Sequence, residues 1–121
     1  MPLFIEELRK RLSVEDVVQL MEAGIFAHFH IARIHPFEDG NGRTARILQD
    51  VILNHYKFPL PVIEAGERSA YFYALKRAIR EWNENNNWEP NSKITLGERE
   101  FYSFIAGKIN VSLDHVLDGI Y

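Results

Sequence analysis

The chain of 121 residues contains no cysteine. Disulfide bonds, a thiolate nucleophile and a cysteine-ligated zinc site are therefore excluded, and the lack of cysteine fits a reducing compartment. Long apolar runs are also missing, because none approaches the roughly 20 residues that a membrane span requires. Acidic residues at positions 6 and 7 interrupt the first apolar stretch, so the N-terminal residues do not resemble a signal peptide.

Positive charge is scarce as well. The sequence has 14 lysines and arginines against 17 aspartates and glutamates, which gives a net charge of −3. This balance argues against a general nucleic-acid binder, because neutralising phosphates requires a surplus of cations. Hydrophobic residues make up 46% of the chain, which is enough for one buried core and excludes a low-complexity linker. We expect a single domain.

Apolar residues recur three or four positions apart along most of the chain, which is the spacing of one face of a helix. The clearest run predicts a long helix from about residue 14 to residue 34 or 35, where Pro36 ends it. Ser13 and Asp16 have the spacing of a capping box at the start of this helix. His28 falls on its apolar stripe, and we expect a buried, hydrogen-bonded histidine rather than a ligand.

The same pattern predicts further helices at residues 3–12, 45–56, 68–82, 98–107 and 112–118. Prolines and asparagines predict irregular segments at residues 58–63 and 83–92. The expected fold class is all-α, with two helices joined by a turn-rich segment at its centre.

The residues that carry chemistry lie in that central segment, which we call the motif segment. It reads His35-Pro36-Phe37-Glu38-Asp39-Gly40-Asn41-Gly42-Arg43-Thr44-Ala45-Arg46. Two glycines bracket an asparagine in a tight turn that leads into a helix. Glycines allow a ligand to approach the backbone closely, and the free N–H groups of a helix start bind anions.

Charged residues around this turn suggest what the anion is. Arg43 and Arg46 are three apart and share a face of the first helical turn, where cations oppose the helix dipole. Two unfavourably placed cations in one turn indicate that a bound anion compensates for them, and a di- or triphosphate would serve. Asp39 could hold Mg²⁺ together with phosphate oxygens. His35 is the natural general base, because its pKa lies near neutrality.

Each of these residues also has an ordinary structural explanation when it is taken alone. Asp39 could only cap the helix, Arg43 could pair with Glu38 or Asp39, and His35 could be a buried structural histidine. The complete set in this order and spacing favours the binding site, as a hypothesis that the structural context must support.

The motif segment resembles the Fic family motif, His-x-Phe-x-(Asp/Glu)-Gly-Asn-Gly-Arg-x-x-Arg, at every fixed position. The flanking residues 27–34 and 71–75 also resemble Fic proteins, so that the resemblance covers about half of the chain. It implies a Fic-type helical bundle and a protein adenylyltransferase, a nucleotidyltransferase that transfers AMP from ATP to a Ser, Thr or Tyr hydroxyl of a target protein. We therefore expect an enzyme, although whether this chain is active by itself stays open.

The resemblance assigns roles to three residues that precede the expected helix. His35 would take the proton from the target hydroxyl, as the catalytic base. Phe37 would anchor the motif in the core. Asp39 would coordinate Mg²⁺, which bridges the α- and β-phosphates of the co-substrate ATP.

The remaining motif residues would bind the nucleotide. Asn41 and the backbone amides around Gly40 and Gly42 would surround the phosphates. Arg43 would hold the β-phosphate, and Arg46 would reach toward the γ-phosphate. Related Doc toxins, which phosphorylate their target, carry Lys in place of Gly42, so the resemblance favours AMP transfer.

Other activities remain alternatives. Fic relatives with similar motifs transfer phosphocholine or UMP, or remove AMP, and a Fic fold could bind nucleotide and a partner without turnover. Residues 105–116 also have the spacing of a DNA-binding helix-turn-helix with Asn110 at the turn, although Asp114 and Asp118 in its second helix oppose binding to phosphates. DNA is therefore an improbable partner.

Two features of Fic proteins are not found in this sequence. Only 34 residues precede His35, and none of them has the pattern of the β-hairpin flap that docks the target. The inhibitory pattern (Ser/Thr)-x-x-x-Glu is missing too. We expect either a fragment of a longer protein or a minimal form, with the inhibitory helix on another segment or supplied in trans by an antitoxin.

We predict a Fic core at residues 1–92 and a C-terminal helical extension of the same domain at residues 93–121. Tyr71 is a candidate contact to the nucleoside, with a core aromatic as an equal alternative. A cytoplasmic location is expected, or delivery into a host cell as part of a larger protein. The sequence does not indicate an oligomeric state.

Overall fold

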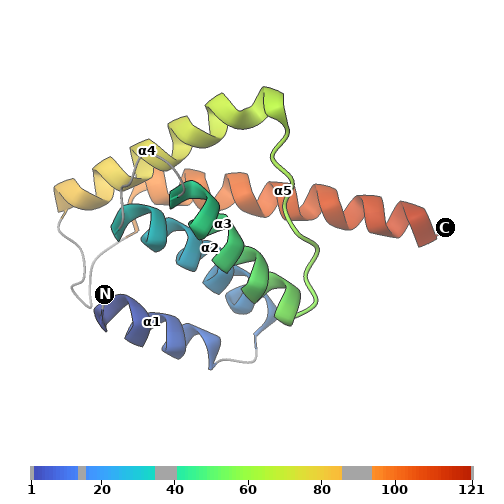
Figure 1. Ribbon diagram of the computed structural model, residues 1–121, viewed down its shortest axis with the longest axis horizontal. Coiled ribbons are helices and arrows are strands. Elements are labelled where there is room, and N and C mark those ends of the chain that lie inside the picture. The colour runs from blue at the N-terminus through green and yellow to red at the C-terminus, as the bar shows by residue number, and fades with distance from the viewer. Residues whose placement is uncertain (1, 14–15, 35–40, 86–93, 121) are drawn as a thin grey trace. The chain divides into compact units, whose positions relative to one another are not determined.

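The computed structural model describes residues 2–13, 16–34, 41–85 and 94–120. These residues form helices α1 (Pro2–Leu12), α2 (Val17–Ile34), α3 (Asn41–His55), α4 (Arg68–Asn85) and α5 (Leu96–Ile120), with a short 3₁₀-helix, η1, at Ala65–Glu67 (Figure 1). The described part of the chain contains no strand, which confirms the all-α fold class.

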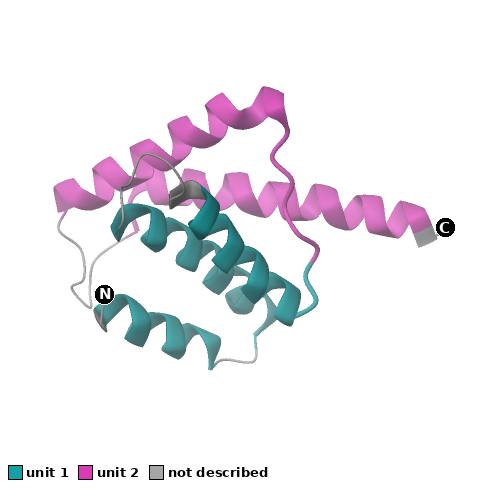
Figure 2. Ribbon diagram, viewed as in Figure 1, with its two compact units in different colours: residues 1–58 teal, residues 59–121 magenta. Residues whose placement is uncertain are grey.

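The chain divides into two compact units, Met1–Phe58 with α1, α2 and α3, and Pro59–Tyr121 with η1, α4 and α5 (Figure 2). The predicted boundary between a core and a C-terminal extension at residue 92 stays a prediction.

Helix α2 is the core helix of the first unit. Every residue from Ala23 to Ala32 is buried, which is typical of a helix that packs against neighbours on several sides. Its start differs from the prediction. Asp16 is the N-cap, and its side chain accepts a hydrogen bond from the backbone N–H of Gln19 at 3.0 Å. Ser13 instead donates its hydroxyl hydrogen to the carbonyl of Lys10, at the end of α1.

Helix α3 ends as the sequence predicts, just before Pro59. Lys57 has a positive φ of 66°, and the backbone N–H of Phe58 donates to the carbonyl of Leu53 at 2.9 Å. The N–H of Lys57 donates to the carbonyl of Asn54. These two bonds form a Schellman motif, which satisfies the last carbonyls of the helix.

In the second unit, α4 packs against α5 through the face predicted for it. The residues on that face, all buried, are Tyr71, Leu75, Ala78 and Trp82. The helix starts at Arg68 as expected and continues three residues beyond the predicted end at Trp82.

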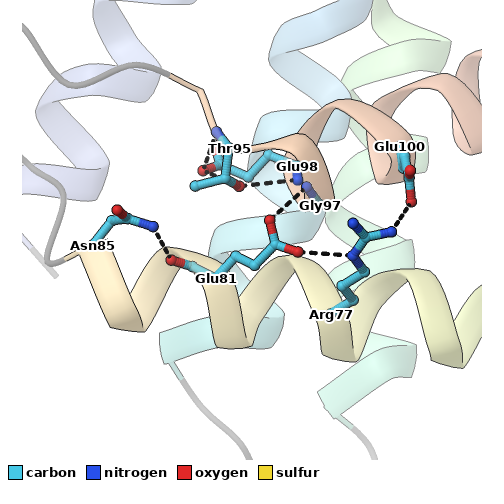
Figure 3. Close-up of polar contacts among 7 residues, drawn as sticks. All are labelled: Arg77, Glu81, Asn85, Thr95, Gly97, Glu98 and Glu100. Atoms are coloured by element: carbon cyan, nitrogen blue, oxygen red, sulfur yellow. Dashed lines mark hydrogen bonds and ion pairs between the residues drawn. The ribbon is translucent and has the colours of Figure 1, made fainter.

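The start of α5 has two layers of capping, both drawn in Figure 3. Thr95 and Glu98 form a capping box, in which each side chain bonds the backbone N–H of the other residue. Glu81 of α4 accepts a further hydrogen bond from the backbone N–H of Gly97 at 3.0 Å. Side chains therefore satisfy three of the free N–H groups at the start of this helix, those of Thr95, Gly97 and Glu98.

The two short helices predicted at residues 98–107 and 112–118 are wrong. Helix α5 is continuous from Leu96 to Ile120 and passes through Gly107 and Asn110 without a break. Neither residue is obliged to end a helix, since each costs only about 1 kcal/mol or less in its interior. A continuous helix has no turn at Asn110, which removes the geometry on which the DNA-binding alternative depends.

None of the five described helices is both long and apolar enough to cross a membrane.

Candidate functional site

The motif segment lies between α2 and α3 and continues into α3. Its first six residues, among them His35, Phe37, Asp39 and Gly40, fall outside the described residues, and their predicted roles stay predictions. Asn41 and Gly42 form the first residues of α3. The turn-rich part of the motif therefore leads directly into a helix N-terminus, where unpaired backbone N–H groups favour an anion.

Arg43 and Arg46 lie in the first two turns of α3. Arg43 is exposed and Arg46 is partly buried, and the first turn of this helix contains no acidic residue. No described residue forms an ion pair with Arg43. A cation at this end of a helix is opposed by the helix dipole, so the arrangement is suited to a bound anion.

Asp50 lies one turn beyond Arg46 on the same helix. Burial raises the pKa of the Asp50 carboxyl above its ordinary value, while a hydrogen bond from Gln49 and the positive charge of Arg46 act in the opposite direction. Arg46 thus lies within electrostatic reach of a half-buried carboxylate on α3.

A buried hydrogen bond joins α2 to α3 behind these charged residues. Nδ1 of His28 lies 2.8 Å from Oε1 of Gln49, and both side chains are almost completely buried. This confirms the prediction that His28 is a buried, hydrogen-bonded histidine. Burial lowers its pKa from 6.5 to about 4; the bond to Gln49 raises the pKa and the charge of Arg46 lowers it further. His28 is therefore neutral at pH 7.

Gly24 brings the same two helices close together one turn earlier on α2. A Cβ at this position would lie 3.0 Å from Cδ2 and 3.1 Å from Cγ of Leu53. Gly24 contacts Leu53, and His28 contacts Gln49. A step of four residues toward the C-terminus of α2 therefore corresponds to a step of four residues toward the N-terminus of α3. The two helices consequently run antiparallel, and the motif segment connects their adjacent ends.

The last turns of α2, which lead to His35, carry a second polar contact. Nε of Arg33 donates to Nδ1 of His30 at 3.0 Å. Burial, followed by the charges of Arg33 and Arg11, lowers the pKa of His30 to about 3. The ring of His30 packs against that of Phe26, with centroids 4.4 Å apart. The Arg11 guanidinium stacks on the same Phe26 ring, 4.0 Å from its centroid. These contacts attach α1 to α2.

Tyr71 belongs to the second unit, where it is buried on α4. Its ring centroid lies 6.3 Å from that of Phe101 and 6.5 Å from that of Phe104. This environment is that of a core aromatic, and a contact with the nucleoside stays a prediction.

Gln49 is the residue that the sequence analysis missed. It is a polar residue on the apolar face of α3, between the buried Ala45 and Ile52. Matching it with His28, the polar residue on the apolar face of α2, would have predicted the buried pair.

The first part of the chain is similar to a known family. Residues 2–53, which include the whole motif segment, match the Fic/DOC family. The matched residues cover α1, α2 and nearly all of α3.

Curated relatives agree with this result. Protein adenylyltransferase Fic of Drosophila erecta is 35% identical over 78 residues, which is 63% of this chain and 16% of the relative. The protein of the same name from Drosophila persimilis is 43% identical over 53 residues, or 44% of this chain and 10% of the relative. That from Drosophila melanogaster is 44% identical over 52 residues, or 43% of this chain and 11% of the relative. The chain thus covers about a sixth or less of the length of these relatives, and no solved structure gave a significant match.

Proposed function

We propose that this chain is the motif-bearing part of a protein adenylyltransferase, which transfers AMP from ATP to a hydroxyl group of a target protein. The observation that carries the proposal is the complete motif at residues 35–46, located within the residues that match the Fic/DOC family. The relatives named protein adenylyltransferase support the same activity.

In the proposed reaction, the oxygen of a Ser, Thr or Tyr hydroxyl attacks the α-phosphorus of ATP. A new O–P bond forms, the bond from the α-phosphorus to the bridging oxygen of the β-phosphate breaks, and pyrophosphate leaves. The proton of the hydroxyl passes to the imidazole of His35, which acts as general base. Reactions of this kind depend on positioning and charge neutralisation more than on covalent help from the protein.

The N-terminus of α3 supplies the positive field for this reaction. We assign the β-phosphate to Arg43 and the γ-phosphate to Arg46, with Asn41 and the amides around Gly40 and Gly42 surrounding the chain of phosphates. The exposure of Arg43 and the lack of an acidic residue in the first turn of α3 support these assignments.

Mg²⁺ is proposed as the companion of ATP, held by Asp39, which is followed two residues later by the start of α3. No group of three histidine, aspartate or glutamate side chains in the described residues could hold a metal ion. A single carboxylate together with phosphate oxygens is the usual environment of Mg²⁺ in nucleotide sites, so such a group is not required.

The target and any inhibitor belong to the same proposal. We expect a protein target, and an inhibitory helix supplied by another segment or by an antitoxin. The same Fic segment could instead hold nucleotide without turning it over, and the experiment below separates the two.

The experiment incubates the chain with Mg²⁺ and ATP labelled on the α-phosphate, together with a lysate as the source of targets. Label should become attached to protein, and His35→Ala should abolish the attachment without changing the affinity for Mg-ATP by more than a few fold. ATP labelled on the γ-phosphate should give no attachment. Attachment from the γ label alone would indicate a kinase, and binding of Mg-ATP without attachment of either label would indicate a binding module.

A further inference from the structure

The buried polar contact between α2 and α3 has no role in the proposed reaction so far. His28 is completely buried and Gln49 is 2% exposed. An apolar pair of similar shape would hold two helices together as well, because a buried hydrogen bond contributes little net stability. A hydrogen bond differs from an apolar contact in that it fixes direction and register.

The direction of each hydrogen bond in this contact follows from its neighbours. Nε2 of Gln49 donates to Oδ1 of Asp50 at 3.3 Å, so that Oε1 of Gln49 faces His28. Since Oε1 can only accept, Nδ1 of His28 carries the hydrogen and Nε2 carries the lone pair. The low pKa of His28 keeps the ring neutral at pH 7, and the hydrogen bond to Gln49 selects this tautomer.

Arg46 lies within electrostatic reach of both ends of this line of residues. Its charge lowers the pKa of His28 at one end and opposes the rise in the pKa of Asp50 at the other. Along α3, Gln49 lies three residues after Arg46 and Asp50 lies four residues after it, which places all three within about one turn. A shift of α3 along α2 would therefore displace Arg46.

We propose that His28, Gln49 and Asp50 form a positioning network, which fixes the register of α3 against α2 and so places Arg46 for the nucleotide phosphates. This inference rests on the proposed function, because it assigns the network to the same phosphate site. None of the three residues needs to touch the nucleotide, and each acts through α3.

Variants that separate packing from positioning test the network. His28→Leu and Gln49→Met each leave a buried polar partner unsatisfied, and both should lower the free energy of unfolding. The double variant removes both polar groups and should recover most of that loss. His28→Asn retains an N–H donor near the place of Nδ1 and serves as the conservative control.

Calorimetric titration of Mg-ATP into these variants gives the deciding result. The double variant should bind about tenfold more weakly than the wild type despite its recovered stability, because small displacements of a positioned group are costly. His28→Asn should bind within about threefold of the wild type. If the double variant binds Mg-ATP like the wild type, the network serves packing alone and the inference is overturned.

A second readout does not depend on nucleotide binding. In the double variant, backbone amides of residues 45–48 should exchange with deuterium about tenfold faster, while the amides of α5 keep their wild-type rates. If the wild type fails to bind Mg-ATP, the proposed function fails for this chain and this readout alone decides whether the register of α3 depends on the network. Unchanged exchange at residues 45–48 would overturn the inference.

Discussion

The two units of the chain use opposite means to hold a pair of helices together. Between α2 and α3, a neutral and fully buried hydrogen bond joins His28 to Gln49. In the second unit, Arg77 of α4 bonds Glu81 of the same helix at 2.7 Å and Glu100 of α5 at 2.6 Å, and these side chains are between 21% and 48% exposed (Figure 3). One contact excludes charge and water, and the other is charged and partly in contact with solvent.

This difference predicts different sensitivities. A buried neutral pair is insensitive to salt, but it depends on the histidine remaining uncharged. A partly exposed ion pair is screened by salt and contributes about 1 kcal/mol or less. In the α4–α5 pair, we therefore expect the close contact at Gly97 and the cap from Glu81 to matter more than the ion pairs.

Acid should produce the largest effect, and it should act on the first unit. The folded pKa of His28 is lowered to about 4, so its contribution to stability is present above its ordinary value of 6.5 and is lost as the pH falls from 6.5 toward 4. The expected loss at pH 4 is roughly 3 kcal/mol from His28 alone. His30, whose pKa is about 3, acts in the same direction.

The second unit should resist this change in pH. The pKa of Glu81 is lowered, chiefly by the hydrogen bond from Gly97, so its contribution is lost only below its ordinary value of 4.5. Unfolding in urea, followed by amide resonances of α2 and by tryptophan fluorescence of Trp82 and Trp88, checks the comparison between pH 7 and pH 5. Equal losses of stability in both units would contradict it.

Alanine at Gly97 should have the second largest effect. A Cβ there would lie 3.1 Å from Cα of Ala78 and 3.0 Å from Oε2 of Glu81, and the backbone atom cannot yield without moving α4. Gly97→Ala should lower the free energy of unfolding by about 1–2 kcal/mol, as measured by urea denaturation.

Two other glycines provide matched controls for this substitution. At Gly24 the obstacle is the Leu53 side chain, which can adjust, so Gly24→Ala should cost less than Gly97→Ala. At Gly107 nothing lies within 4 Å, and Gly107→Ala should stabilise α5 by about 1 kcal/mol. A loss at Gly107 as large as that at Gly97 would refute the argument from close packing.

Glycine at Lys57 should stabilise the first unit. Lys57 has a φ of 66° at the end of α3, a conformation that glycine adopts at lower cost. Lys57→Gly should raise the midpoint of thermal unfolding, with a gain of about 1 kcal/mol. Lys57→Ala is the control, because alanine has the same steric strain as lysine, and an equal gain from alanine would show that backbone strain is not the cause.

The ion pair between Arg77 and Glu100 should have the smallest effect. Glu100→Gln should cost less than about 0.5 kcal/mol at low salt and still less in 0.5 M NaCl, where screening weakens exposed charges. Urea denaturation at the two salt concentrations measures the change. A loss above 1 kcal/mol that persists in high salt would mean that this pair behaves like the buried contact of the first unit.

The sequence predicted the parts of the fold that depend on periodicity. The helical class, the end of α3 before Pro59 and the buried face of α4 follow from the spacing of apolar residues and from proline. The start of α2 was misplaced because both Ser13 and Asp16 can cap a helix, and only the structure shows which of them bonds Gln19. The break predicted near Asn110 failed because local preference at one residue does not interrupt a long helix.

For the candidate site, the sequence indicated where the motif lies but not which buried residues join the neighbouring helices α2 and α3. Spacing and residue type single out residues 35–46 as the candidate site, and the roles assigned to its residues stay predictions. Gln49 was missed because its importance depends on a partner 21 residues away in the sequence, and pairs of this kind depend on how two helices face each other.

Binding of Mg-ATP tests the central claim, an anion site at the start of α3, most directly. Calorimetric titrations would compare the wild type with two charge-matched variants, Arg43→Ala with Arg46→Ala, and Arg9→Ala with Lys10→Ala at exposed positions of α1. The account predicts Mg²⁺-dependent binding that the first variant loses by tenfold or more, on the order of 1.4 kcal/mol, and that the second retains. No binding by the folded wild type, or equal weakening in both variants, would contradict it.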